Sequence, residues 1–264
     1  MSFTEHSTSK LQVDPPEFKC DAVIGKDIEE PLPKTAFFMA LMGSAGSGKT
    51  SLMVNLLTMD GMYKKCFDHV HLIAPEASMK SLKNDIWAKH PGDKVHHSLD
   101  IITLNDIDNR ANVRRAKKPP ETTLLIIDDM TVMLKKKEIE AKLRKMVFNR
   151  RHNYTSIMIL VQSYIAMPLD IRKTLSHFFM FKPRNKKEAE AIWDELLNMP
   201  KKIGDELLRF VFQNPHDFLM GDTNTGSVYR NFNLVECPED IQTSSLVDDK
   251  QINDINTFKK QKTT

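Results

Sequence analysis

The sequence predicts an α/β fold, a doubly wound and mostly parallel sheet flanked by helices, with a C-terminal β-hairpin. Short apolar runs alternate with segments of helical periodicity, as expected for parallel strands joined by crossover helices. The apolar run 35–42 leads into a glycine/serine loop and then a helical pattern. A second apolar run ends in Asp128 and Asp129. In such sheets ligands bind at the carboxyl ends of the strands, so we expect the loop and the aspartates at one edge.

The length suits one large α/β domain, or one domain with a small appendage. Hydrophobic residues make up 41% of the 264, enough for a substantial core. No apolar run approaches the ~18–20 residues needed to span a bilayer, so we expect no transmembrane segment. The N-terminal residues show no basic region followed by an apolar one, so we expect no secretory signal. Three widely separated cysteines, Cys20, Cys66 and Cys237, predict reduced thiols in an intracellular compartment.

A net charge of only +3 excludes a global polycation, but the basic residues cluster. Such clusters suit a phosphate backbone, but any one of them is more often a solvated surface, so they support nucleic-acid binding only together with other evidence. The clusters lie at residues 114–118, 135–137, 182–187 and 259–262.

Three regions divide the chain. Residues 1–33 are polar and punctuated by prolines, and we interpret them as an N-terminal arm that is poorly ordered or laid on the surface. Residues 34–236 are predicted to form the α/β domain, and residues 237–264 a polar C-terminal tail.

In the first half of the domain, the fully apolar run 35–42 predicts a central strand, and Pro75 closes a second one. Ser78 can cap a helix that Pro91 and Gly92 end. We expect, in order, strand 35–42, helix 49–57, strand 69–74, helix 78–87, a short strand 99–104 and helix 107–115.

In the second half, residues 123–129 form the strongest strand pattern, and Ile139, Leu143 and Met146 mark the buried stripe of a helix. Gly204 is expected to precede another helix, and the turn residues 221–226 predict a β-hairpin. We expect, in order, strand 123–129, helix 138–149, strand 156–162, helix 170–174, strand 177–181, helix 186–197, a helix through residue 211, and hairpin strands 217–220 and 227–232.

The loop after the first strand matches the pattern G-x-x-x-x-G-K-[ST] in its required strand–loop–helix context. Its glycines let backbone amides approach an anion at a helix N-terminus. Lys49 would reach the outer phosphates of a nucleotide, and the Thr50 hydroxyl would bind Mg²⁺. A serine/glycine turn that only resembles the motif is the alternative. The expected nucleotide-binding residues are Gly43, Ser44, Ala45, Gly46, Ser47, Gly48, Lys49, Thr50 and Ser51.

Asp128 and Asp129 follow a buried strand, where carboxylates are placed to act on a bound nucleotide. Asp128 fits the role of Mg²⁺ ligand, and Asp129 that of the group that polarises the attacking water. Asp129 is shorter than the glutamate of many ATPases, so Glu76, just after the second strand, is the alternative base. An ordinary Asp-Asp turn is the structural alternative.

Gln162 ends an otherwise apolar strand, where its amide could contact the γ-phosphate or orient the water. A strand-terminating glutamine without catalytic role is the alternative. Arg150, Arg151 and Arg172 flank the same strand and are candidates for an arginine finger presented to a neighbouring subunit. Each is equally well explained as a surface arginine.

The chain resembles the genome-packaging ATPases of nucleocytoplasmic large DNA viruses and virophages, a branch of the FtsK–HerA superfamily. The resemblance spans residues 36–234, and the arginine–histidine turn leading into a glutamine-ended strand is its most specific part. An Asp-Asp ending also fits the viral branch. The matching pieces are residues 43–50, 125–129, 151–164, 171–174 and the hairpin 218–233.

The resemblance implies a P-loop NTPase fold of the RecA/ASCE type, with ATP and Mg²⁺ as cofactors. It implies a homo-oligomeric ring, a pentamer or hexamer, that pumps double-stranded DNA into a preformed capsid. Arg151 becomes the leading candidate for the trans arginine finger. The expected partners include a capsid portal vertex or membrane-associated assembly components. The expected location is the host cytoplasm, in the virus factory, and the virion.

Other functions share the same loop. A helicase or another DNA-processing ATPase would use the same core, although this chain has little room for large helicase insertions. A nucleotide kinase would carry an arginine-rich lid and no separate sensor glutamine. A slowly hydrolysing switch or assembly protein is a further alternative, but no Asn-Lys-x-Asp motif for guanine is present.

Overall fold

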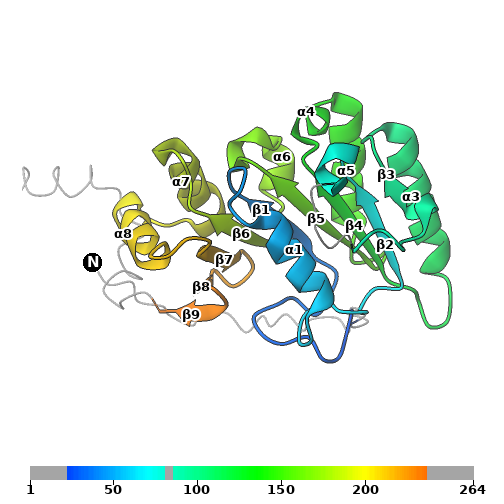
Figure 1. Ribbon diagram of the computed structural model, residues 1–264, viewed down its shortest axis with the longest axis horizontal. Helices are drawn as coiled ribbons and strands as arrows, with labels where there is room; N and C mark the ends of the chain where they lie inside the picture. The colour runs from blue at the N-terminus through cyan, green and yellow to red at the C-terminus, as the bar shows by residue number, and fades with distance from the viewer. Residues whose placement is uncertain (1–22, 81–85, 237–264) are drawn as a thin grey trace, which may run out of the picture.

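The computed structural model describes residues 23–80 and 86–236, and within them nine strands form a single mixed sheet with the order β3-β2-β4-β5-β1-β6-β7-β8-β9 (Figure 1). Every pairing from β3 to β6 is parallel, and the pairings from β6 to β9 are antiparallel. The strands are β1 Phe38–Met42, β2 His69–Ile73, β3 Val95–His96, β4 Thr123–Asp128, β5 Thr155–Val161, β6 His177–Phe181, β7 Phe218–Asp222, β8 Val228–Arg230 and β9 Asn233–Val235.

Helices connect the parallel strands and follow the apolar periodicity of the sequence. In α5, for example, Ile139, Leu143 and Met146 are buried at helical spacing. A short π-helical segment, Trp193–Leu197, continues α7. The helices are α1 Lys49–Thr58, α2 Glu76–Lys80, α3 Ile101–Arg114, α4 Thr131–Leu134, α5 Lys137–Asn149, α6 Leu169–Arg172, α7 Lys186–Ile192 and α8 Lys201–Val211.

Two hydrophobic cores lie on the two faces of the sheet, because the central strands are buried on both sides. Helices α3, α5, α7 and α8 contribute to one core, and α1 contributes Leu52, Met53 and Leu56 to the other (Figure 1). Ile28 and Leu32, from the described part of the N-terminal arm, join the α1 core. The expected α/β architecture, with helices on both faces and a C-terminal hairpin, is therefore confirmed.

The structure differs from the sequence-based expectations at four places. The expected strand 99–104 is wrong, because the Asp100 carboxylate accepts a hydrogen bond from the Thr103 backbone N–H (2.8 Å) and caps α3. Gly204 lies inside α8 rather than before it, and a Cβ there would sit 2.4 Å from the Trp193 indole nitrogen, so the glycine permits close packing. The short strands β3 and β9 were not expected.

Several expectations fall partly or wholly outside the described residues. The expected helix 78–87 overlaps α2 and residues 81–85, which are not described. Most of the N-terminal arm, the C-terminal tail and its basic cluster 259–262 also lie outside. Of the three cysteines, the structure describes Cys66, which is a free thiol. In the part of the chain that is described, no helix is long and apolar enough to cross a membrane.

The strand order positions the site. β5 lies between β1 and β4, with Met42 level with Val161 and Asp128 level with Leu160. Because these strands are parallel, their carboxyl ends share one edge of the sheet. The phosphate loop after β1, the aspartates at the end of β4 and Gln162 after β5 are thus brought to adjacent positions.

Candidate active site

The loop between β1 and α1 packs directly against the end of β6. Gly43 is buried there, and a Cβ at this position would lie 2.8 Å from the Phe181 Cβ. Gly48, at the start of α1, has φ +112°, a conformation that side-chain-bearing residues rarely adopt. The two glycines therefore allow a tight turn that leaves Ala45 and Gly46 exposed to solvent.

The Lys49 side chain closes this loop. Its ammonium donates hydrogen bonds to the carbonyl oxygens of Gly43 (2.6 Å) and Ser44 (3.0 Å). Burial lowers the pKa of Lys49 below its ordinary value, and the nearby carboxylates of Asp128 and Asp129 partly oppose that shift. The ammonium is thus held against the first two carbonyl groups of the loop.

The end of β4 carries two carboxylates in different settings. Asp128 is half-buried, and burial raises its pKa to about 6, with Asp129 adding to the shift and Lys49 opposing it. Asp129 is exposed and has φ +52°, an uncommon conformation for a residue other than glycine. The backbone therefore turns sharply between them, so the two carboxylates have different surroundings.

Gln162 meets this pair from the next strand. Its side-chain Nε2–H donates to Asp129 Oδ1 at 3.1 Å. Two residues that the sequence separates by 33 positions are thereby joined beside the phosphate loop. Glu76, the alternative base, is exposed at the start of α2, beyond β2. In the sheet, β2 lies one strand farther from β1 than β4 does, so Glu76 is more distant from the loop than Asp129.

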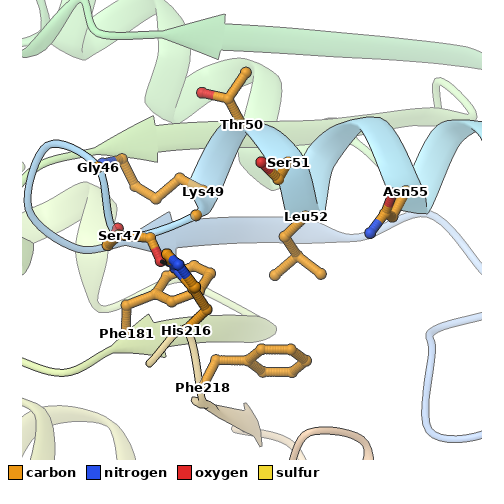
Figure 2. A pocket seen from close by; sticks show the side chains of 11 residues that line it. Gly46, Ser47, Lys49, Thr50, Ser51, Leu52, Asn55, Phe181, His216 and Phe218 are labelled. Carbon is orange, nitrogen blue, oxygen red and sulfur yellow. Dashed lines mark hydrogen bonds between the residues drawn. The ribbon is translucent and has the colours of Figure 1, made fainter. Parts of the chain in front are cut away.

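A cavity of about 410 Å³ opens beside the loop and α1. Figure 2 shows Phe181, His216 and Phe218 together on one side of α1, whereas the Thr50 side chain points to the other side. A ring nitrogen of His216, Nδ1, lies 2.9 Å from the Ser47 carbonyl oxygen. Sequence reasoning missed this aromatic group, because β7 brings it to the loop through tertiary pairing and no spacing in the sequence signals it.

The three candidate arginines have different environments. Arg172 binds Glu195 through two hydrogen bonds (2.6 and 2.8 Å) and lies over the Tyr164 ring. Arg150 is half-buried and donates to the Val147 carbonyl (3.0 Å). Arg151 is exposed, in the turn before β5, and so lies at the opposite edge of the sheet from the phosphate loop. The structure thus does not bring any of the three into its own subunit's site.

The residues present fit a magnesium–nucleotide complex. Mg²⁺ is usually held by one or two protein groups together with substrate phosphates and water. Asp128, with its pKa raised by burial, is a carboxylate whose ionised form a nearby cation would stabilise. Among the described residues no group of three or more His, Cys, Asp or Glu side chains could hold a metal ion by itself. In the described part of the chain, one carboxylate without a full set of protein ligands agrees with a Mg²⁺ ion that binds together with the nucleotide phosphates.

The fold and the site define a P-loop ATPase of the type in which a further strand separates the phosphate loop from the acidic strand. The chain belongs to the poxvirus A32 protein family, whose family model matches residues 27–211, well over half of its length. By family and fold it is a viral DNA-packaging ATPase. No match was found among curated protein sequences.

Solved structures share the fold. The crystal structure of B204, the DNA-packaging ATPase from Sulfolobus turreted icosahedral virus, gives a TM-score of 0.54 at 14% identity, over 74% of this chain and 96% of that chain. B204 from Sulfolobus turreted icosahedral virus 2 in complex with ATP-gammaS gives 0.51 at 17% identity, over 76% and 98%. The cytoplasmic domain of the type VII secretion ATPase EccC from Thermomonospora curvata gives 0.53 at 14% identity, over 76% of this chain and 24% of that chain.

Proposed function

We propose that the protein is one subunit of a ring-shaped motor that hydrolyses ATP to move double-stranded viral DNA into a preformed capsid. The observation that carries this proposal is the hydrogen bond from Gln162 to Asp129 (3.1 Å) beside Lys49. In the proposed roles it would join a γ-phosphate sensor to a water-activating carboxylate, a combination that supports hydrolysis rather than nucleotide binding alone.

Each residue of the site would contribute a distinct step. The amides of residues 43–48 and the Lys49 ammonium would hold the phosphates. Thr50 and Asp128 would hold Mg²⁺, which neutralises charge on the β- and γ-phosphates when bound. Asp129 would accept a proton from the attacking water, and Gln162 would orient that water and contact the γ-phosphate. Glu76 stays the less direct candidate for the base because of its distance in the sheet.

The cavity beside α1 would receive the nucleoside part of ATP. Phe181 and Phe218 are largely buried (3% and 9% exposed) and form an apolar wall of this cavity, and Asn55 lines it with an amide. His216 is the exposed aromatic side chain of the cavity, and an aromatic ring can stack on any base. Because His216 contacts Ser47, occupation of the cavity would also steady the phosphate loop.

A ring is proposed because none of the three candidate finger arginines reaches the phosphate loop of its own subunit, so a neighbouring subunit would have to supply one. Arg151 is the leading trans finger, since it is exposed and lies at the edge of the sheet away from the phosphate loop. A head-to-tail ring of five or six subunits would bring it to the neighbour's γ-phosphate. The contacts of Arg172 with Glu195 support a structural role for that arginine and so favour Arg151.

The protein acts on DNA in the infected cell, where virions assemble. The host cytoplasm, the virus factory and the virion are the proposed locations. We propose a capsid portal vertex or membrane-associated assembly components as the docking partner. The basic clusters 114–118, 135–137 and 182–187 are candidates to line the DNA channel.

The direct test is ATP hydrolysis measured against oligomeric state, with and without duplex DNA. We expect DNA to stimulate hydrolysis, and Lys49→Ala to abolish it while circular dichroism shows an unchanged fold. Lys89→Ala, a lysine far from the loop in sequence, is the charge control. Equal turnover with and without duplex DNA, in an assembled ring, would contradict the motor function.

Mixed rings test the finger. Arg151→Ala subunits and Lys49→Ala subunits are each expected to be inactive alone. Mixed together, they place an intact Lys49 opposite an intact Arg151 at some interfaces, so activity should partly return. No recovery in rings shown by native mass spectrometry to contain both subunits would exclude the trans role of Arg151.

A further inference from the structure

The segment that follows β6 passes over the phosphate loop. β6 runs parallel to β1 with Met180 level with Met42, so both strands end at the same edge. The close contact between Gly43 and Phe181 then holds the end of β6 against the loop. Residues 182–187 leave from that point and carry four cations and no acid: Lys182, Arg184, Lys186 and Lys187.

Within this segment Arg184 has a distinctive position. It borders a cavity of about 220 Å³ together with Gly43, Ser44 and Gln162. It also borders a cavity of about 450 Å³ that reaches Gly46 and Ser47. Arg184 therefore lines two of the cavities that border the phosphate loop.

No neighbouring carboxylate among the described residues binds the Arg184 guanidinium, so it can bind a phosphate. Glu188 is the acidic residue that lines the smaller cavity, but it is buried and its Oε1 accepts the Tyr164 backbone N–H at 2.7 Å. Arg184 itself is exposed, and in the described part of the chain no hydrogen bond or ion pair holds it. Arg172, by contrast, is held by Glu195.

The orientation of the bound nucleotide determines which of its phosphates Arg184 would contact. The aromatic cavity for the nucleoside lies beside α1, at Asn55 and Phe218, whereas Gln162 and Asp129 mark the γ-phosphate end. Arg184 shares its smaller cavity with Gln162. A guanidinium is planar and presents paired N–H donors that match a phosphate better than an ammonium does.

We propose that Arg184 binds the terminal phosphate of ATP within its own subunit and so distinguishes ATP from ADP. This inference rests on the proposed ATPase function and adds a second arginine to the site, supplied in cis, besides the finger proposed in trans. It also gives one member of the basic segment 182–187 a role in nucleotide recognition rather than in DNA binding.

The test compares the binding of ADP and ATPγS, each with Mg²⁺, by calorimetry at fixed salt and without DNA. Arg184→Ala is expected to weaken ATPγS binding about tenfold, as the loss of one charge-assisted contact predicts, with ADP binding unchanged. Arg184→Lys should recover only part of the difference, because it restores the charge without the paired donors. Lys187→Ala removes the same charge from the same segment and should leave both affinities as in wild type.

Three results would overturn the assignment. Arg184→Ala could weaken ADP and ATPγS binding equally, or weaken neither. In a separate titration with duplex DNA it could lose DNA affinity while the preference for ATPγS stays intact. These differ from failure of the proposed function itself. Wild-type protein that binds neither nucleotide would refute the ATPase site as a whole. Wild-type protein that prefers ATPγS, with the same preference in Arg184→Ala, would refute only the role of Arg184.

Discussion

Arg172→Ala removes one half of an ion pair that is largely shielded from solvent. The Arg172 and Glu195 side chains are only 13% and 17% exposed, and two hydrogen bonds of 2.6 and 2.8 Å join them. The Tyr164 hydroxyl donates to the same carboxylate at 2.9 Å, and its ring lies 5.1 Å from the guanidinium carbon. The guanidinium holds the pKa of Glu195 below its ordinary value, so the carboxylate is charged at neutral pH.

The cost of this substitution follows from the charge that it leaves behind. Removing one partner of a buried pair typically costs about 3–5 kcal/mol, because the other charge stays without compensation. Since both side chains keep some contact with water, we expect about 2–3 kcal/mol for Arg172→Ala. In a domain of this size that loss corresponds to a melting temperature lower by about 4–12 °C.

Urea unfolding followed by circular dichroism measures the effect. Glu195→Ala should cost a similar amount, and the double variant should cost clearly less than the sum of the two single variants. Lys173→Ala, at the exposed neighbouring position, is the control and should change stability little. If Arg172→Ala unfolds like wild type but loses ATP hydrolysis, the pair is not structural, and Arg172 returns as the finger.

Two further predictions concern the phosphate site. Burial raises the pKa of Asp128 to about 6, so the folded state binds this proton more tightly than the unfolded state, and stability from this group is lost as pH rises from about 4 to 6. Asp128→Asn should therefore be inactive, yet its free energy of unfolding at pH 8 should exceed that of wild type by at most about 3 kcal/mol. Urea titrations should show this difference shrinking toward pH 4. Equal stability of variant and wild type at pH 8 would contradict the prediction. Gly48→Ala places a side chain at φ +112°, so it should lower the free energy of unfolding by about 1–2 kcal/mol and weaken ATP binding. Gly92→Ala is the control, because a Cβ there meets open space. It should change neither stability nor ATP affinity in the same thermal and binding assays.

The sequence alone determined the class of fold, the phosphate loop and the acidic strand end. These features depend on chemistry between near neighbours: glycines at fixed spacing, a lysine at a helix start, and an apolar run that ends in Asp128. Gln162 could be identified for the same reason, as a polar residue that ends a buried strand. The failed strand at 99–104 shows the limit of this reasoning. There the apolar, β-branched residues favour a strand locally, but Asp100 caps a helix whose buried face includes Leu104 and Ile107.

Only the tertiary structure separated residues that look alike in the sequence. The residue pattern alone does not separate Arg151 from Arg172, and the family resemblance favours Arg151. The structure adds that Glu195 binds Arg172 from 23 positions away. Phe181, His216 and Phe218 join the site only because β6 and β7 pair antiparallel beside the phosphate loop. Arg184 gained its position from the parallel pairing of β1 with β6. Pairing between distant segments creates these contacts, and no local periodicity encodes which distant segment will arrive.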